Sequence, residues 1–276
     1  MNFTFVILII ITGISLTFLL SWKPNKAGQL YSTHPMWFAH RGLLHTAPEN
    51  TIAAYMAAAE TDVPGLEMDV VCTCDGVIIC SHNYDLERET DGSGYIFEKD
   101  YSYISNVNAA AKWPGRTDRM PTLESTLTKI SSGIRVNIEL KTRKVLDFKI
   151  ALKTAAIVQR LGMVERVIIS SFNPFSLGII KLFYPAVLTG FIFESKLHFS
   201  LVHFARPDCL HPRADFVTDD LVCYARERKL AINAWTVNTR PAMEWLLRQG
   251  IDGLITDRPE FRHDDSILQI SVSESN

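Results

Sequence analysis

Short apolar runs alternate with helical patterns through most of this chain, and that alternation restricts the fold more than any other feature. Runs typical of strands occupy residues 36–39, 65–70, 77–80, 134–140, 166–171, 187–193, 230–237 and 253–255. Helical patterns lie between most of them, including 145–161, 218–229 and 240–249. Strands that alternate with helices indicate βαβ units and a parallel sheet.

Length favours a closed barrel over an open doubly wound sheet. Beyond an N-terminal segment of about thirty residues, roughly 245 remain, close to the roughly 250 of a (β/α)₈ barrel. An open sheet is the alternative, but no Gly-x-Gly-x-x-Gly follows a strand run to support it. We therefore predict a (β/α)₈ TIM barrel over residues 36–262. The formal net charge of −2 gives no indication of nucleic-acid binding.

The N-terminus predicts a membrane anchor. Residues 1–20 carry no charged side chain and are mostly apolar, and about twenty apolar residues suffice for a transmembrane helix. A cleaved signal peptide is the alternative, but its basic beginning and small-residue cleavage site are missing. We expect an anchor over 1–22, a linker over 23–35 and a polar tail over 263–276. Lys23 and Lys26 favour the cytoplasmic side for the catalytic part.

Acidic side chains inside two of the strand runs mark a candidate site. Because strand side chains alternate between faces, Glu67 and Asp69 share one face of their run, as do Glu139 and Lys141 of theirs. Strands of a parallel sheet are normally apolar on both faces, so buried carboxylates need a cation, a base or a metal. A structural ion pair between Glu139 and Lys141 would leave the other two carboxylates unexplained. Three carboxylates suit one divalent cation, Mg²⁺ or Ca²⁺.

Two of the eight histidines stand where barrel enzymes place their working groups. His40 and His82 each follow a strand run. With pKa values naturally near neutrality, one imidazole can accept a proton while the other donates one. Together with the carboxylates, they indicate metal-assisted attack on an anionic ester.

Several motifs, in order along the chain, resemble those of one known family. The opening pair is Ala39-His40-Arg41-Gly42 with Pro48-Glu49-Asn50-Thr51, and the second is Gly65-Leu66-Glu67-Met68-Asp69-Val70 with Ser81-His82. Later matches are Asn137-Ile138-Glu139-Leu140-Lys141, Ser171-Phe172-Asn173, Ala234-Trp235-Thr236-Val237-Asn238 and Thr256-Asp257-Arg258-Pro259. The ensemble resembles the glycerophosphodiester phosphodiesterases.

The resemblance implies a barrel enzyme that hydrolyses a glycerophosphodiester to an alcohol and glycerol 3-phosphate. It assigns the divalent ion to Glu67, Asp69 and Glu139, and general acid–base catalysis to His40 and His82. Arg41 and Lys141 would bind the phosphate, and Glu49 and Asn50 would orient His40 or Arg41. Trp235 would offer an apolar wall to the glycerol, although ordinary barrel core is an alternative reading of this ring.

One position departs from the family pattern. The family usually has aspartate directly after the second histidine, whereas this chain has Asn83. An amide can orient His82 but supplies no charge, so we expect activity to survive with a lower pH optimum.

Two further segments bear on the substrate. Residues 83–120 are too long for an ordinary loop, so we predict an insertion or cap. It either helps select the leaving alcohol or is a self-packed surface flap. The apolar stretch 191–204 carries the hypothesis that acyl chains bind there and that lysophospholipids are substrates, giving lysophosphatidate. A short amphipathic helix packed on the barrel is the alternative.

Two other functions stay open on sequence alone. One is a different metal-dependent barrel lyase or isomerase, with Lys141 as a Schiff-base lysine. The other is an inactive relative that binds phosphate esters, for which Asn83 is the one supporting feature.

Overall fold

The computed structural model describes residues 5, 12–13, 22–24, 27, 30–31, 34–264 and 267. The predicted anchor over 1–22 and the polar tail over 263–276 therefore lie almost wholly outside the described residues. Among the residues described, no helix is both long and apolar enough to cross a membrane.

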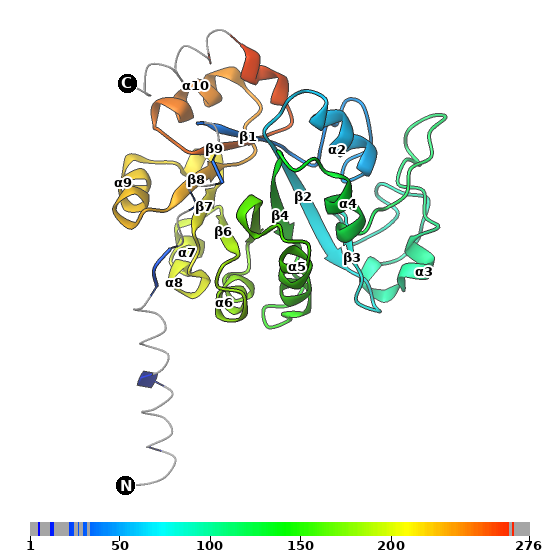
Figure 1. Cartoon of the computed structure of the whole chain (residues 1–276), viewed down its shortest axis with the longest axis horizontal. Helices are drawn as coiled ribbons and strands as arrows, with labels where there is room; N and C mark the ends of the chain where they lie inside the picture. The colour runs from blue at the N-terminus through cyan, green and yellow to red at the C-terminus, as the bar shows by residue number, and fades with distance from the viewer. Residues whose placement is uncertain are drawn as a thin grey trace.

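Eight parallel strands close into a ring, which confirms the predicted (β/α)₈ barrel (Figure 1). Around the ring they are β1 (Met36–Ala39), β2 (Gly65–Cys72), β4 (Arg135–Leu140), β5 (Val167–Ser171), β6 (Leu188–Phe193), β7 (Cys209–Pro212), β8 (Ala231–Ala234) and β9 (Gly253–Thr256). β1 pairs with β2 on one side and with β9 on the other. Closure leaves no free edge, so the open-sheet alternative is wrong.

Two strands differ from the sequence prediction. The run 77–80 forms β3 (Ile78–Cys80), which pairs antiparallel with β2 and stands outside the ring. The eighth barrel strand is instead β7, which the sequence pattern did not reveal. It has only four residues, including His211 and Pro212, and it is held between β6 and β8.

Helices cover the outside of the ring. They are α2 (Ile52–Ala59), α4 (Leu123–Lys129), α5 (Lys149–Arg160), α6 (Pro174–Phe183), α7 (Lys196–Phe199), α8 (Val202–Ala205), α9 (Asp219–Arg228) and α10 (Arg240–Arg248). Side-chain oxygens cap several helix N-termini by accepting a backbone N–H, as Thr51, Thr122, Asn173 and Thr218 do. Each such cap stabilises its helix by about 1 kcal/mol.

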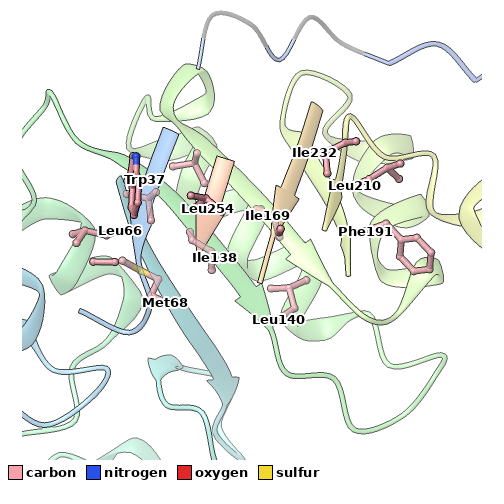
Figure 2. Close-up of a cluster of buried hydrophobic side chains, with 14 of the residues drawn as sticks. Trp37, Leu66, Met68, Ile138, Leu140, Ile169, Phe191, Leu210, Ile232 and Leu254 are labelled. Atoms are coloured by element: carbon pink, nitrogen blue, oxygen red, sulfur yellow. The ribbon is translucent and has the colours of Figure 1, made fainter. Parts of the chain in front are cut away.

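The main core lies between the strands and these helices. Leu66 and Met68 of β2, Ile138 of β4 and Ile169 of β5 are fully buried in it (Figure 2). On β2 and β4 the apolar residues alternate with polar ones, so the apolar set packs against the helices and the polar set points into the ring. From the stretch 191–204, Phe191, Phe193 and Val202 belong to this core, and Phe199 and Leu201 pack against it, as the alternative of short helices packed on the barrel predicts.

The insertion over 83–120 packs around a core of its own beside β3 (Figure 1). It contains η2 (Ile96–Glu98) and α3 (Tyr101–Ile104). The buried side chains of this small core are Val71, Ile79, Leu86, Ile96, Ile104, Val107, Ala109 and Met120. Because Val71 and Ile79 come from β2 and β3, the insertion is fastened to the C-terminal end of the second barrel strand.

The N-terminal end of the barrel is closed by residues that the sequence suggested were linker. Leu30 and Tyr31 are buried there. The Tyr31 hydroxyl exchanges hydrogen bonds with the Asn233 amide (3.0 and 2.7 Å), and Arg135 donates to the Leu30 carbonyl (3.0 Å). This plug leaves the opposite, C-terminal end of the ring as the mouth.

Candidate active site

Three carboxylates converge at the C-terminal end of the barrel. In the register of β2 and β4, Asp69 faces Glu139 and Glu67 faces Asn137. One oxygen from each of Glu67, Asp69 and Glu139 lies within 4.8 Å of the other two. Neighbouring parallel strands thus bring together side chains seventy residues apart, and the result is a candidate site for one metal ion.

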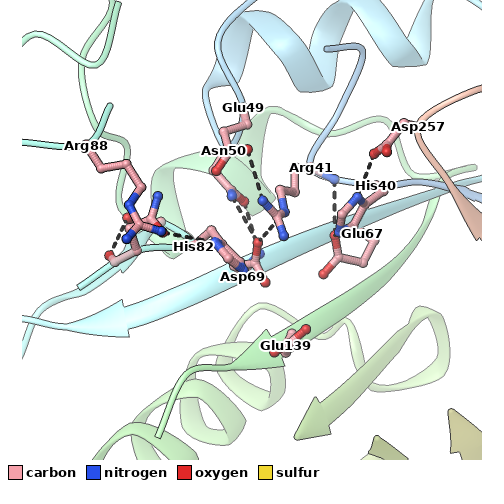
Figure 3. A network of polar contacts seen from close by, with 12 residues as sticks. His40, Arg41, Glu49, Asn50, Glu67, Asp69, His82, Arg88, Glu139 and Asp257 are labelled. Atoms are coloured by element: carbon pink, nitrogen blue, oxygen red, sulfur yellow. Dashed lines mark hydrogen bonds and ion pairs between the residues drawn. The ribbon is translucent and has the colours of Figure 1, made fainter. Parts of the chain in front are cut away.

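Two positively charged side chains form ion pairs with this cluster. Lys141 Nζ lies 2.9 Å from Asp69 Oδ1 and also pairs with Glu139. Arg41 Nε lies 3.1 Å from the other Asp69 oxygen, while its Nη1 donates to Glu49 at 3.0 Å (Figure 3). Asp69 is therefore held between two positive charges.

A tight turn after β1 places Arg41. Arg41 has φ +57° and Gly42 φ +94°, and the Arg41 backbone N–H donates to Glu67 at 3.1 Å. A Cβ on Gly42 would lie 2.6 Å from the Ala54 backbone. Glycine is required there both by the positive φ and by the close approach of α2.

The pKa values of the three carboxylates differ sharply. Burial and the Asp69 charge raise the pKa of Glu67 to about 8. Asp69 is equally buried, but Lys141 and Arg41 overcome the desolvation and lower its pKa to about 2. Burial and Asp69 also raise the pKa of Glu139, against the attraction of Lys141. The raised pKa values of Glu67 and Glu139 mean that the two cations do not suffice to ionise all three carboxylates, and a divalent cation would supply the missing positive charge.

His40 is fixed by a carboxylate from the last barrel strand. Its Nδ1 lies 2.6 Å from Asp257 Oδ1, just beyond β9, and its Nε2 lies 4.0 Å from Glu67 (Figure 3). Asn238 donates to the other Asp257 oxygen at 2.6 Å. Burial opposes a charge on His40, but Asp257 and then Glu67 outweigh it and raise the His40 pKa.

His82 follows β3 and has neutral partners. Its Nδ1 lies 3.2 Å from the Asn83 side-chain oxygen, which also accepts from Arg88 at 3.2 Å. Burial lowers the pKa of His82, and the nearby Asp69 charge offsets this only in part. The two imidazoles are thus tuned in opposite directions.

Of the remaining predicted residues, some contact the carboxylate cluster or its cations and others lie elsewhere at the mouth. Glu49 contacts Arg41, as the sequence suggested. Asn50, expected to orient His40 or Arg41, donates its backbone N–H to the Arg41 carbonyl at 3.1 Å, and its side chain contacts Asp69. Its Nδ2 donates to Asp69 Oδ2 at 3.1 Å, while its Oδ1 accepts from the Asp69 backbone at 3.0 Å. Trp235 packs edge-on against Phe172 and donates to the His211 carbonyl, and no contact described for it reaches the carboxylates.

A small cavity of about 50 Å³ opens beside His82, between the barrel mouth and the insertion. Its lining includes three carboxylates, those of Glu49, Asp85 and Glu89, and the ring of Trp113.

Sequence reasoning missed the roles of Asp257 and Asn238. Both belong to motifs that the sequence displays, Thr256-Asp257 and Val237-Asn238. The motif order alone did not show that Asp257 reaches His40, because the contact spans 217 positions and depends on closure of the ring between β9 and β1.

Comparisons with known proteins agree with this geometry. The model of the Glycerophosphoryl diester phosphodiesterase family matches residues 40–261. The chain is similar to the glycerophosphodiester phosphodiesterase of Caldanaerobacter subterraneus subsp. tengcongensis, with 34% identity over 229 residues, 80% of this chain and 93% of the relative.

Solved structures of phosphodiesterases share the fold of this chain. A phosphodiesterase of Oleispira antarctica, in complex with the product sn-glycerol-3-phosphate, is 25% identical with a TM-score of 0.75, over 88% of this chain and 99% of that one. A glycerophosphodiester phosphodiesterase of Thermotoga maritima is 25% identical with a TM-score of 0.68, over 83% and 96%.

Proposed function

The chain belongs to the glycerophosphoryl diester phosphodiesterase family, and on that premise we propose that it hydrolyses glycerophosphodiesters to an alcohol and glycerol 3-phosphate. The carboxylate cluster at the barrel mouth, with ligand atoms within 4.8 Å, carries the proposal. The product bound by the Oleispira antarctica relative supports the choice of diester. A Schiff base on Lys141 fits poorly, because Asp69 and Glu139 outweigh burial and raise the Lys141 pKa, which keeps the amine protonated.

Glu67, Asp69 and Glu139 would hold one divalent cation, Mg²⁺ or Ca²⁺. Their donor set is all oxygen, which these hard cations prefer. The raised pKa of Glu67 supports the assignment, because a buried carboxylate beside another carboxylate needs positive charge to ionise. When bound, such an ion polarises a phosphoryl oxygen as a Lewis acid.

Arg41 and Lys141 would bind the non-bridging phosphate oxygens. Both are held in place by ion pairs with Asp69, at 3.1 and 2.9 Å. A side chain that is already oriented loses little entropy when the substrate arrives, and its charge stabilises the negative charge that grows in the transition state.

We assign His40 as the general acid and His82 as the general base. Asp257 favours the protonated imidazole of His40, which suits a group that must donate a proton to the leaving alcohol. His82 has a lowered pKa and is neutral near pH 7, which suits a group that must take a proton from the attacking oxygen. With Nδ1–H donating to the Asn83 oxygen, His82 Nε2 is the free acceptor.

Asn83 therefore fits an active enzyme. An amide oxygen selects the same tautomer of His82 as a carboxylate would, but without raising its pKa. The inactive-relative alternative would have to explain why three carboxylates, two cations and two oppositely tuned histidines still meet at one mouth.

The lysophospholipid hypothesis and the membrane anchor remain proposals. Leu197 of α7 is 83% exposed and Leu146, on the loop before α5, is 73% exposed, so apolar side chains are available on the surface for an acyl chain. The uncharged segment 1–20 supports the anchor, and Lys23 supports the cytoplasmic side.

The test is a panel of diesters assayed with EDTA and then with Mg²⁺ or Ca²⁺ restored. We expect glycerol 3-phosphate release that EDTA abolishes, and loss of turnover in His40→Ala and Glu67→Gln. Comparing glycerophosphocholine with lysophosphatidylcholine tests the lipid hypothesis. Turnover that survives both chelation and these substitutions would refute the proposed chemistry.

A further inference from the structure

A second cavity, of about 170 Å³, is larger than the one beside His82. Lys141 lines it, and the same ammonium pairs with Asp69 and Glu139. The cavity therefore begins where the phosphate would bind. Tyr84 and Phe97 of the insertion form its aromatic wall.

Positive charge dominates the lining beyond Lys141. The lining includes Arg143 and Lys149 but one carboxylate, Asp147, whose oxygen accepts the Lys149 backbone N–H at 3.2 Å. Within the part of the chain that the structure describes, no carboxylate forms an ion pair with Arg143 or Lys149. Lys149 Nζ donates one hydrogen bond to the Cys74 carbonyl at 3.2 Å, which leaves its charge without a carboxylate partner among the described residues, so both positive charges can attract a ligand in this cavity.

The Phe97 ring, one of the two aromatic side chains in the wall, already has partners on its faces. The guanidinium carbon of Arg143 lies 3.3 Å from the centre of the Phe97 ring, and Tyr95 stacks on Phe97 with 5.1 Å between ring centres. A quaternary ammonium group binds proteins through free aromatic faces. Here Arg143 covers the face of Phe97, and its charge would repel such a group.

Starting from the proposed function, we propose that this cavity binds the leaving alcohol and selects alcohols that carry negative charge over those that carry a quaternary ammonium group. An additional phosphate on the alcohol would meet Arg143 and Lys149. A neutral polyol would be intermediate, since it can accept hydrogen bonds from both cations without ionic attraction.

Because Arg143 and Lys149 are exposed, water weakens their attraction, and each should change substrate preference by a moderate factor. Charge-assisted contacts at such exposed sites correspond to roughly two- to fivefold in an equilibrium. The preference for an anionic over a cationic alcohol should therefore be roughly four- to 25-fold when both residues act.

The experiment measures kcat/KM of the full chain for three soluble diesters with identical glycerol phosphate halves. They are bis(glycerophospho)glycerol, with an anionic leaving alcohol, glycerophosphoglycerol, with a neutral one, and glycerophosphocholine, with a cationic one. Arg143→Gln should lower the anionic-to-cationic ratio roughly two- to fivefold, and Arg143→Lys should keep most of it.

Lys144→Gln is the matched control. Lys144 neighbours Arg143 on the same exposed loop but does not line the cavity. The proposal requires that Lys144→Gln leave the ratio unchanged. Equal effects of Arg143→Gln and Lys144→Gln would indicate a general surface field and overturn it.

A preference of the unmodified enzyme for glycerophosphocholine would also overturn it, and would instead favour the small acidic cavity beside His82. Metal-dependent turnover without any charge preference would refute the subsite while leaving the proposed function intact. Absence of turnover on all three diesters would refute both.

Discussion

Replacing Asn83 with aspartate tests how the protein tunes His82. The substitution keeps the size of the side chain and puts a negative charge where the amide oxygen now lies, 3.2 Å from His82 Nδ1. His82 has a pKa lowered mainly by burial, with partial compensation from Asp69. A carboxylate at position 83 would favour the protonated imidazole and raise that pKa.

The size of the expected rise in the His82 pKa follows from the distance between the two charges and from the screening by solvent. Two charges about 4 Å apart attract by about 4 kcal/mol at the effective dielectric of a protein surface. Arg88 contacts the same oxygen at 3.2 Å and would take up part of the new charge. Solvent at this half-buried position weakens the rest. We therefore expect a rise of about one pKa unit, equivalent to about 1.4 kcal/mol.

The assay is kcat/KM against pH for a soluble diester at saturating divalent cation. A general base works only when it is unprotonated, so a raised pKa moves the acid limb of the profile upward by about one unit. Well below both pKa values, Asn83→Asp should be about tenfold slower than the unmodified enzyme. At high pH it should be equal or faster, because the imidazole is then the stronger base.

Two controls separate this effect from others. Asn83→Ala removes the hydrogen bond without adding charge, so it should lower the rate without moving the acid limb upward. Ser132→Asp adds the same charge in the loop before β4, at the closed end of the barrel, and should leave the profile unchanged. An acid limb that stays in place in Asn83→Asp would show that His82 is not the base, or that position 83 does not tune it.

Three further substitutions test other parts of the account. Asp257→Asn should lower the pKa of His40, which moves the basic limb of the pH–rate profile to lower pH, and should slow turnover about 10- to 100-fold. A basic limb that stays in place would contradict the role of His40 as the acid. Glu67→Gln should weaken Mg²⁺ or Ca²⁺ binding at least about tenfold in calorimetry, while its circular dichroism spectrum stays unchanged. If the variant binds the ion as tightly as the unmodified enzyme does, Glu67 is not a metal ligand. Met68→Ala, in the fully buried outer core, should lower the free energy of unfolding in urea by about 2–5 kcal/mol, and a loss under 1 kcal/mol would mean the core repacks.

Local pattern was sufficient for most of the barrel. The apolar runs of β1, β2, β4, β5 and β6 are long or regular enough to identify from sequence. β7 was not, because Cys-Leu-His-Pro has neither alternation nor a β-branched residue. Its extended form comes from the strands on either side of it, which is a tertiary cause.

The candidate site divides in the same way. Alternation along one strand put Glu67 and Asp69 on one face, and motif order joined them to His40, His82 and Glu139. The partner of His40 could not be found from spacing, because Asp257 reaches it only when the ring closes. Asn50 likewise turned out to position Asp69, since the left-handed turn at its φ of +57° aims its amide at β2.

What the sequence determined is therefore the chemistry: which side chains can hold a cation, carry protons and bind phosphate, and on which strand face each lies. These are properties of residue type and of a two-residue repeat, and both are local. Tertiary structure decided the pairings, namely Asp69 between two cations, Asp257 on His40, and Arg143 over Phe97 beside the mouth. Such contacts join positions far apart in the chain, and they exist only once strand register and ring closure fix the distances between them.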